Sequence, residues 1–262
     1  MKLLYRQVLF FKLCSLIASP TWSETINIAY NSDWPPYSFM GPQNQVHGIL
    51  VDLLDTIFDN HFHITPINYG FPWKRVQSEV KKGTMDAFIT VPTDERLSYT
   101  YRSVNIVYTI KMQAITRNEP YIIQHINHVS FAEDFQNFRV CEIIGNGWGY
   151  NFWESHQINF HTVPKASNCL QRIVKDYADL MIQAYAVGNY EVARLALQNK
   201  LIILPKVYGT MKFTLLLSKK SKFSTDLIKQ FDYAINELIE TNQYQTIIDQ
   251  AISHYTHSAS PK

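Results

Sequence analysis

The sequence predicts an α/β protein built from two Rossmann-like lobes that are joined by two crossing strands, with a ligand cleft between the lobes. Three observations support this prediction. Short β-rich runs alternate with amphipathic helical patterns, the alternation restarts halfway along the chain, and a long extended run follows each half. Such alternation is typical of parallel strands with helices on both faces of the sheet.

The first half opens with a β-rich run over residues 25–30, and apolar residues at helical spacing follow over 49–58. Residues 62–69 are expected to form a strand, residues 73–82 a helix and residues 86–91 a buried strand. This β-α-β-α-β order implies neighbouring parallel strands.

The second half repeats the pattern without any residue-level repeat of the first. The expected strands cover 139–144, 159–163, 179–182 and 201–204, and the expected helices cover 148–156, 166–175 and 187–198. The chain therefore predicts two similar α/β units.

Two apolar, β-rich runs, residues 103–116 and 207–218, separate the units and differ from Gly/Ser linkers. We interpret them as strands that cross between the lobes. The predicted division is a first lobe over 24–112, a second lobe over 113–206, and a returning segment over 207–262 that holds a crossing strand and C-terminal helices. Ligands of open α/β sheets bind beyond the carboxyl ends of strands, so two facing lobes would form a cleft.

The helical tail shows one apolar face, and Ser224 is a candidate N-cap with Asp226 in the first turn. The simplest architecture returns this tail to the first lobe.

Residues 1–23 resemble a secretory signal peptide. They contain three basic and no acidic residues, a mostly apolar middle, and small residues before the expected cut after Ser23. A membrane anchor is the alternative, but the uninterrupted apolar run is shorter than the roughly 20 residues that span a bilayer. We expect a periplasmic protein.

The charge balance argues against nucleic acid as a partner. The whole chain has 24 Lys and Arg against 22 Asp and Glu, and loss of the three basic leader residues leaves 21 against 22, a formal charge of −1. A near-neutral chain with few basic runs lacks the electrostatic footprint of a nucleic-acid-binding protein.

Cys141 and Cys169 remain after the leader is removed. A lone pair of cysteines in an oxidising compartment often forms a disulfide, and two buried free thiols are the alternative. We expect the bond because we expect export.

The order of motifs resembles that of the family 3 extracellular solute-binding proteins, the polar amino-acid receptors of ABC transporters. This resemblance implies the type II periplasmic-binding-protein fold and covers nearly all of the chain after the leader. The segments that carry it are 33–39 (DWPPYSF), 48–53 (GILVDL), 73–86, 93–96 (TDER), 140–149, Asp179 and the terminal helical pair.

The resemblance implies a ligand site with aromatic walls and a cation. Trp34, in a proline-rich turn with Tyr37, and Trp73, at the start of a helix, match the two aromatic positions. Arg96 matches the arginine that takes the ligand carboxylate, and a guanidinium is suited to that bidentate contact. Ordinary packing of the tryptophans and a surface ion pair of Arg96 are the alternatives.

Further contacts follow from the same resemblance. The family's hydroxyl five residues before the arginine is replaced here by Val91, so the backbone N–H of Val91 or Thr93 would serve instead. In the second lobe, Gly145, Asn146 and Gly147 lie between a strand and a helix, where free N–H groups attract anions.

One departure from the family is large. The aspartate that pairs with the ligand ammonium stands five residues after the signature aspartate, and that place is Ala184 here, with Gln183 beside it. The ligand would either lack an α-ammonium or use another group. Ligand capture is therefore better supported than the identity of the ligand.

Other chemistries have weaker signals. The close histidine pairs at 61/63 and 125/128 lack zinc-ligand spacing with other ligands, and no cofactor motif is present. A periplasmic dehydratase on this fold would need a cleft acid, for which Glu142 and Glu191 are the candidates. A sensory module for a partner receptor is a third reading. We expect a monomeric, non-enzymatic receptor whose partners are a small molecule and an ABC transporter permease.

Overall fold

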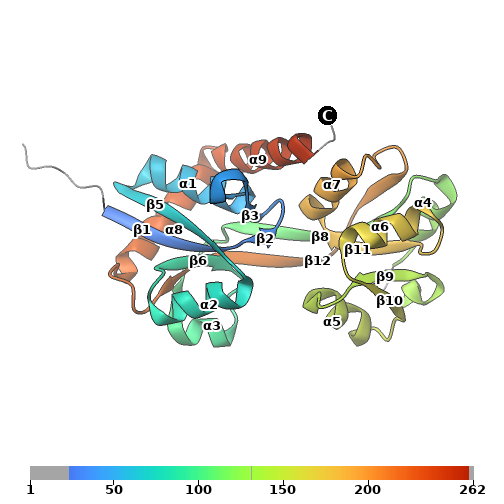
Figure 1. Ribbon diagram of the computed structural model, residues 1–262, viewed down its shortest axis with the longest axis horizontal. Coiled ribbons are helices and arrows are strands. Elements are labelled where there is room, and N and C mark those ends of the chain that lie inside the picture. Colours follow the sequence, from blue (N-terminus) through green and yellow to red (C-terminus); the bar gives the residue numbers. More distant parts are fainter. Residues whose placement is uncertain (1–23, 131, 260–262) are drawn as a thin grey trace, which may run out of the picture.

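A computed structural model describes residues 24–130 and 132–259. The expected signal peptide, residues 1–23, lies outside the described residues. Figure 1 shows two α/β lobes side by side with long strands running between them, which confirms the predicted fold class.

The first lobe is built on the predicted β-α-β-α-β unit. Its elements are β1 (Glu24–Asn31), α1 (Ile49–His61), β5 (Ile64–Phe71), α2 (Trp73–Lys82) and β6 (Ala87–Thr90). β1 lies between β5 and β6 and is parallel to both. The apolar face of α1 is fully buried, as its spacing predicts.

Short elements that the periodicity does not reveal complete this lobe. A small antiparallel sheet consists of β2 (Asp33–Trp34), β3 (Ser38–Met40) and β4 (Val46–His47), with the 3-10 helix η1 (Pro42–Asn44) between β3 and β4. α3 (Asp94–Tyr99) and β7 (Thr100–Arg102) follow β6. Two- and three-residue strands are too short to produce a readable alternation.

The second lobe repeats the architecture. Its elements are α4 (Pro120–Asn127), η2 (Ala132–Asn137), β9 (Val140–Ile143), α5 (Gly147–Ser155), β10 (Phe160–Val163), α6 (Ala166–Val174), β11 (Leu180–Ala184) and α7 (Tyr185–Arg194). β9 lies between β10 and β11 and is parallel to both.

The crossing strands are β8 (Tyr108–Arg117) and β12 (Leu201–Ser218), and they differ from the prediction. The expected strand 201–204 and the extended run 207–218 form one strand, because register shifts between Ile203 and Gly209 absorb the interruption at Pro205. The first run starts as a strand only at Tyr108, and residues 103–107 are a connection. Through β8 and β12, both lobes share one nine-stranded sheet.

The tail forms α8 (Thr225–Glu240) and α9 (Gln243–Ala259). Ser224 caps α8 as predicted, because its hydroxyl accepts a hydrogen bond from the backbone N–H of Asp226 at 3.1 Å. Both helices pack on α1, and α9 also packs on α7 of the second lobe. The C-terminal helix thus bridges the lobes along one side of the crossing strands (Figure 1).

The predicted disulfide is confirmed. Cys141 on β9 and Cys169 on α6 are bonded, with Cα atoms 5.6 Å apart, and both are fully buried. The bond fastens α6 to the sheet of the second lobe.

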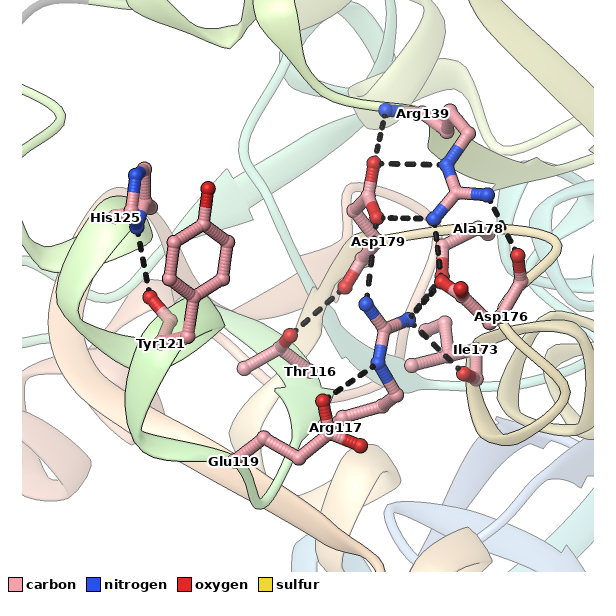
Figure 2. A network of polar contacts seen from close by, with 10 residues as sticks. All are labelled: Thr116, Arg117, Glu119, Tyr121, His125, Arg139, Ile173, Asp176, Ala178 and Asp179. Carbon is pink, nitrogen blue, oxygen red and sulfur yellow. Dashed lines mark hydrogen bonds and ion pairs between the residues drawn. The ribbon is translucent and has the colours of Figure 1, made fainter.

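An ion-pair network lies where β8 ends and where β9 and β11 begin. Figure 2 shows Arg117 and Arg139 directed at Asp179. Arg139 makes a bidentate contact with Asp179, with Nη2 at 2.6 Å from Oδ1 and Nε at 3.1 Å from Oδ2. Arg117 reaches the same carboxylate at 3.5 Å and Asp176 at 3.1 Å. Asp179, the signature aspartate of the sequence, therefore ties together the ends of β8, β9 and β11.

Candidate ligand site

A pocket of about 310 Å³ lies where β1 and β6 of the first lobe end. Its wall combines residues from these strand ends, from β2 and the start of α2, and from the crossing strand β12. The lining residues are Ala29, Tyr30, Asn31, Trp34, Ser38, Leu50, Trp73, Ile89, Thr90, Val91, Arg96, Met211 and Phe213. Strand carboxyl ends are where an open α/β sheet presents its ligand site.

Trp34 forms one aromatic wall. Its ring centre lies 4.6 Å from that of Tyr37 and 5.8 Å from that of Phe213, and the side chain is partly buried. Tyr37 itself is 1% exposed and lies behind Trp34 rather than in the pocket. Trp34 is therefore a wall of the pocket, and Tyr37, a candidate ligand contact from the sequence, is a buried support behind it.

Trp73 and Arg96 form the opposite wall. The guanidinium carbon of Arg96 lies 5.2 Å from the centre of the Trp73 ring, within range of a cation–π contact. Arg96 Nη1 donates to the carbonyl of Val91 at 2.7 Å and to Thr90 Oγ1 at 3.3 Å, and Nε donates to Gln77 Oε1 at 3.2 Å. These contacts fix the plane of the guanidinium.

The third nitrogen of the guanidinium, Nη2 of Arg96, has no hydrogen-bond partner within the described part of the chain. Arg96 also makes no ion pair with its neighbours Asp94 and Glu95. Burial lowers the pKa of Arg96 from its ordinary value, but a guanidinium stays charged at neutral pH. The arrangement leaves a charged, oriented donor beside an apolar cavity.

Val91 and Thr93 contribute differently. Val91 lines the pocket, and its carbonyl is used by Arg96. Thr93 is the N-cap of α3, where its hydroxyl accepts from the backbone N–H of Arg96 at 3.4 Å, and it does not line the pocket. The buried hydroxyl of Thr90 lies in the wall instead, one residue from the position that the sequence comparison with the family indicates.

The second-lobe loop lies apart from this pocket. Gly145 has a left-handed φ of 80°, Asn146 is the N-cap of α5, and Gly147 begins the helix. The loop rests on Glu142, whose Oε1 accepts from Asn146 Nδ2 at 2.9 Å and whose Oε2 accepts from Trp153 Nε1 at 2.9 Å. Burial raises the pKa of Glu142, which is fully enclosed beneath the loop.

Gln183 and Ala184 end β11 on the second lobe. Ala184 is 2% exposed, and its backbone N–H donates to Gln183 Oε1 at 2.8 Å, so the amide oxygen of Gln183 is already used. Neither residue lines the pocket. The next residue, Tyr185, starts α7 and is 39% exposed.

The structure thus brings together Trp34, Trp73, Val91 and Arg96 and places the predicted second-lobe residues outside the pocket. The floor residues Met211 and Phe213 were missed because they belong to an apolar run that also fits a buried strand. Met211 and Phe213 are two residues apart on the crossing strand β12, so their side chains face the same side of the sheet. This spacing was the available signal.

The pocket wall carries a single positive charge. Arg96 is the one ionised side chain among its lining residues, and the remainder are aromatic, aliphatic or neutral polar groups. This combination suits a ligand that has one carboxylate and a body able to stack between indole rings.

Comparisons with known proteins identify the family and the fold. The family model "Bacterial extracellular solute-binding proteins, family 3" matches residues 26–254. No match was found among curated protein sequences. Within the described residues, no helix has both the length and the apolar character needed to cross a membrane.

Solved structures share the fold at low identity. One is the second substrate-binding domain of a Streptococcus pneumoniae protein assigned as an amino acid ABC transporter, with a TM-score of 0.69, 20% identity, and coverage of 87% of this chain and 99% of that one. The L-cystine solute receptor of Neisseria gonorrhoeae, unliganded and open, gives a TM-score of 0.68 at 13% identity, covering 88% and 93%. A histidine kinase sensor domain gives 0.62 at 18% identity, covering 87% and 95%.

Proposed function

Since the chain belongs to the family 3 bacterial extracellular solute-binding proteins, we propose that it captures a small carboxylate-bearing ligand, an amino acid or an analogue of one, for an ABC transporter. The observation that carries the proposal is Arg96, held over Trp73 with Nη2 directed to no protein acceptor among the described residues. A ligand carboxylate would complete the hydrogen bonding of the guanidinium.

Capture would proceed by closure of the lobes. The ligand would first contact the first-lobe wall, which contains Trp34, Trp73 and Arg96. Rotation about β8 and β12 would then bring the N–H groups of the loop at Gly145–Gly147 toward its exposed side. The pocket is lined only by first-lobe and β12 residues, as expected for a receptor before closure.

We propose binding without catalysis. Glu142, one candidate acid, lies beneath the second-lobe loop and accepts three hydrogen bonds, including one from the backbone of Ile143 at 2.6 Å. Glu191, the other, pairs with Arg194 on the same helix at 2.6 Å. Neither acid lines the first-lobe pocket, and both are already held by other groups of the second lobe, which argues against a role as general acid.

The proposal places the protein in the periplasm as a monomer that delivers its ligand to an inner-membrane permease.

A thermal-shift screen of the standard amino acids and their des-amino counterparts tests the ligand class. Ligands that raise the melting temperature of the native protein are expected to lose this effect in Arg96→Ala and to keep it in Arg102→Ala, an exposed arginine outside the pocket.

Small-angle scattering on the same complexes tests closure. The radius of gyration should fall when a ligand from the screen saturates the protein. A screen in which no carboxylate acts, or in which Arg96→Ala keeps the full response, would contradict the proposed function.

A further inference from the structure

A second cavity of about 260 Å³ lies beside the hinge, between α9 and the crossing strand β8. It shares no lining residue with the first pocket. Pairing of β11 with β8 ends at Ala184 and Met112, so the β8 stretch from Tyr108 to Lys111 has β12 on one edge and this cavity near the other.

Both lobes contribute to the cavity. Tyr185 comes from the first turn of α7 in the second lobe, whereas Tyr244, Asp249 and Ile252 come from α9, which returns to the first lobe. Lys111 belongs to the crossing strand between them. A bound molecule would therefore touch both lobes and the hinge at once.

The cavity carries one cation and one anion. Lys111 makes no ion pair within the described residues, and Asp249 uses Oδ1 to accept from Gln245 Nε2 at 2.8 Å without any ion pair there. The two charges also lie too far apart to pair with each other. A molecule that carries both a carboxylate and an ammonium could engage both groups.

The remaining wall is apolar or neutral. Ile248 is 7% exposed and lies near Ile252 on one face of α9. Burial raises the pKa of Tyr108 to about 12 and that of Tyr244 to about 12, so both phenols stay protonated at neutral pH. The Tyr244 hydroxyl donates to the carbonyl of Val107 at 2.6 Å.

We propose that this hinge pocket is a second binding site, for a small zwitterionic amino acid with an apolar side chain. Its carboxylate pairs with Lys111, its ammonium pairs with Asp249, and its side chain rests on Ile248 and Ile252. The hinge pocket differs from the first pocket in its carboxylate, since the first presents Arg96 and no acidic residue among its lining residues.

The two sites are joined by a row of aromatic rings. Tyr37 lies 4.6 Å from Trp34 of the first pocket and 5.5 Å from Tyr108 of the hinge pocket, measured between ring centres. Because the hinge pocket spans both lobes, its occupant opposes or favours their rotation and thereby changes ligand affinity at the first pocket.

Calorimetry with L-leucine and 4-methylpentanoate, which lacks the ammonium, tests the proposal. L-Leucine is expected to bind the native protein and to weaken at least about tenfold in both Lys111→Met and Asp249→Asn. Lys212→Met is the matched control, because Lys212 is an exposed lysine on β12 that does not line the cavity. Melting curves establish that each variant is folded.

Arg96→Ala separates this site from the proposed function. L-Leucine binding at the hinge pocket should survive Arg96→Ala, and 4-methylpentanoate should not bind there. In the Arg96→Ala background, absence of L-leucine binding, or its retention when Lys111→Met or Asp249→Asn is added, would overturn the hinge site without affecting the case for the first pocket.

Discussion

The guanidinium of Arg96 lies over the ring of Trp73, 5.2 Å from its centre, so the charge of the ligand pocket and one of its aromatic walls form a single unit. Removal of either side chain would change the surroundings of the other. Their effects on ligand binding should therefore not add.

Arg96→Ala is expected to weaken binding of a carboxylate ligand by about 2–5 kcal/mol, because the anion would lose the one charged donor among the residues that line the pocket. Arg96→Lys should restore only part of this loss, since an ammonium cannot reproduce the planar fork. Calorimetry on both variants, on Trp73→Ala and on the double variant measures the coupling. Additive losses from Arg96→Ala and Trp73→Ala would show that the two residues act independently.

Trp34→Ala should weaken ligand binding by about 1–4 kcal/mol and leave the fold intact, because the ring forms a pocket wall. Ligand addition should also change tryptophan fluorescence, and this change should shrink in the variant. Tyr37→Ala is the contrasting change, since Tyr37 is buried and its loss should lower the melting temperature. A variant lacking Trp34 that binds normally but melts early would place this ring in the core.

Ala184→Asp should improve binding of α-amino acids relative to their des-amino partners, since the position matches the family's ammonium contact. Calorimetry on the matched pair L-glutamate and glutarate measures the preference directly. Ala184→Asn, similar in shape without the charge, is the control. Equal preference in all three proteins would mean that position 184 does not reach the ligand.

The disulfide should contribute about 3–4 kcal/mol to stability in the chain-entropy model, because Cys141 and Cys169 are 28 residues apart. Denaturant unfolding of the double variant Cys141→Ala/Cys169→Ala against the native protein measures this difference. Thiol titration of unfolded, unreduced native protein should find neither of the two cysteines reactive. A stoichiometric reaction would refute the bond.

The ion pairs of Asp179 should make the free energy of unfolding depend on pH. Burial alone raises the pKa of Asp179, but hydrogen bonds from Arg139 and its charge outweigh this and lower the pKa overall. A carboxyl group with a lowered folded-state pKa stabilises above its unfolded value of about 3.9 and loses that contribution as the pH falls through the folded value. Asp179→Asn should therefore destabilise the protein at pH 7 and have a diminishing effect below about pH 4.

Urea unfolding at several pH values gives the comparison. Asp226→Asn serves as the control, because the exposed Asp226 pairs only with Lys229 and Ser224 at the surface. A constant difference between native protein and Asp179→Asn from pH 7 to pH 3 would contradict the role of this ion pair.

Much of the fold could be predicted because its signals are local. The apolar face of α1 repeats at helical spacing, and the buried run of β6 is short and continuous. The course of β12 could not be predicted in the same way. Pro205 and Gly209 resemble breaks in a strand, and only the register with β8 shows that the strand continues past them.

The same distinction between local and non-local signals applies to the candidate site. Trp34, Trp73 and Arg96 line one pocket and could be proposed from the sequence because they stand in short motifs that resemble those of the family. The roles of Thr90 and Phe213 depend on which side of a strand faces the cavity and on how the lobes are oriented. Those are properties of the assembled sheet, which no local pattern encodes.

β12 runs unbroken through both lobes for 18 residues, with β8 beside it. Two lobes joined by loops can rotate with little resistance, whereas two lobes joined by a pair of hydrogen-bonded strands rotate only if the strands twist. If the lobes rotate as we propose, the rotation would add twist to the paired strands, concentrated where the register shifts between Ile203 and Gly209 loosen the ladder. That added twist would relax when the ligand departs, and the relaxation would favour return of the lobes to their open arrangement.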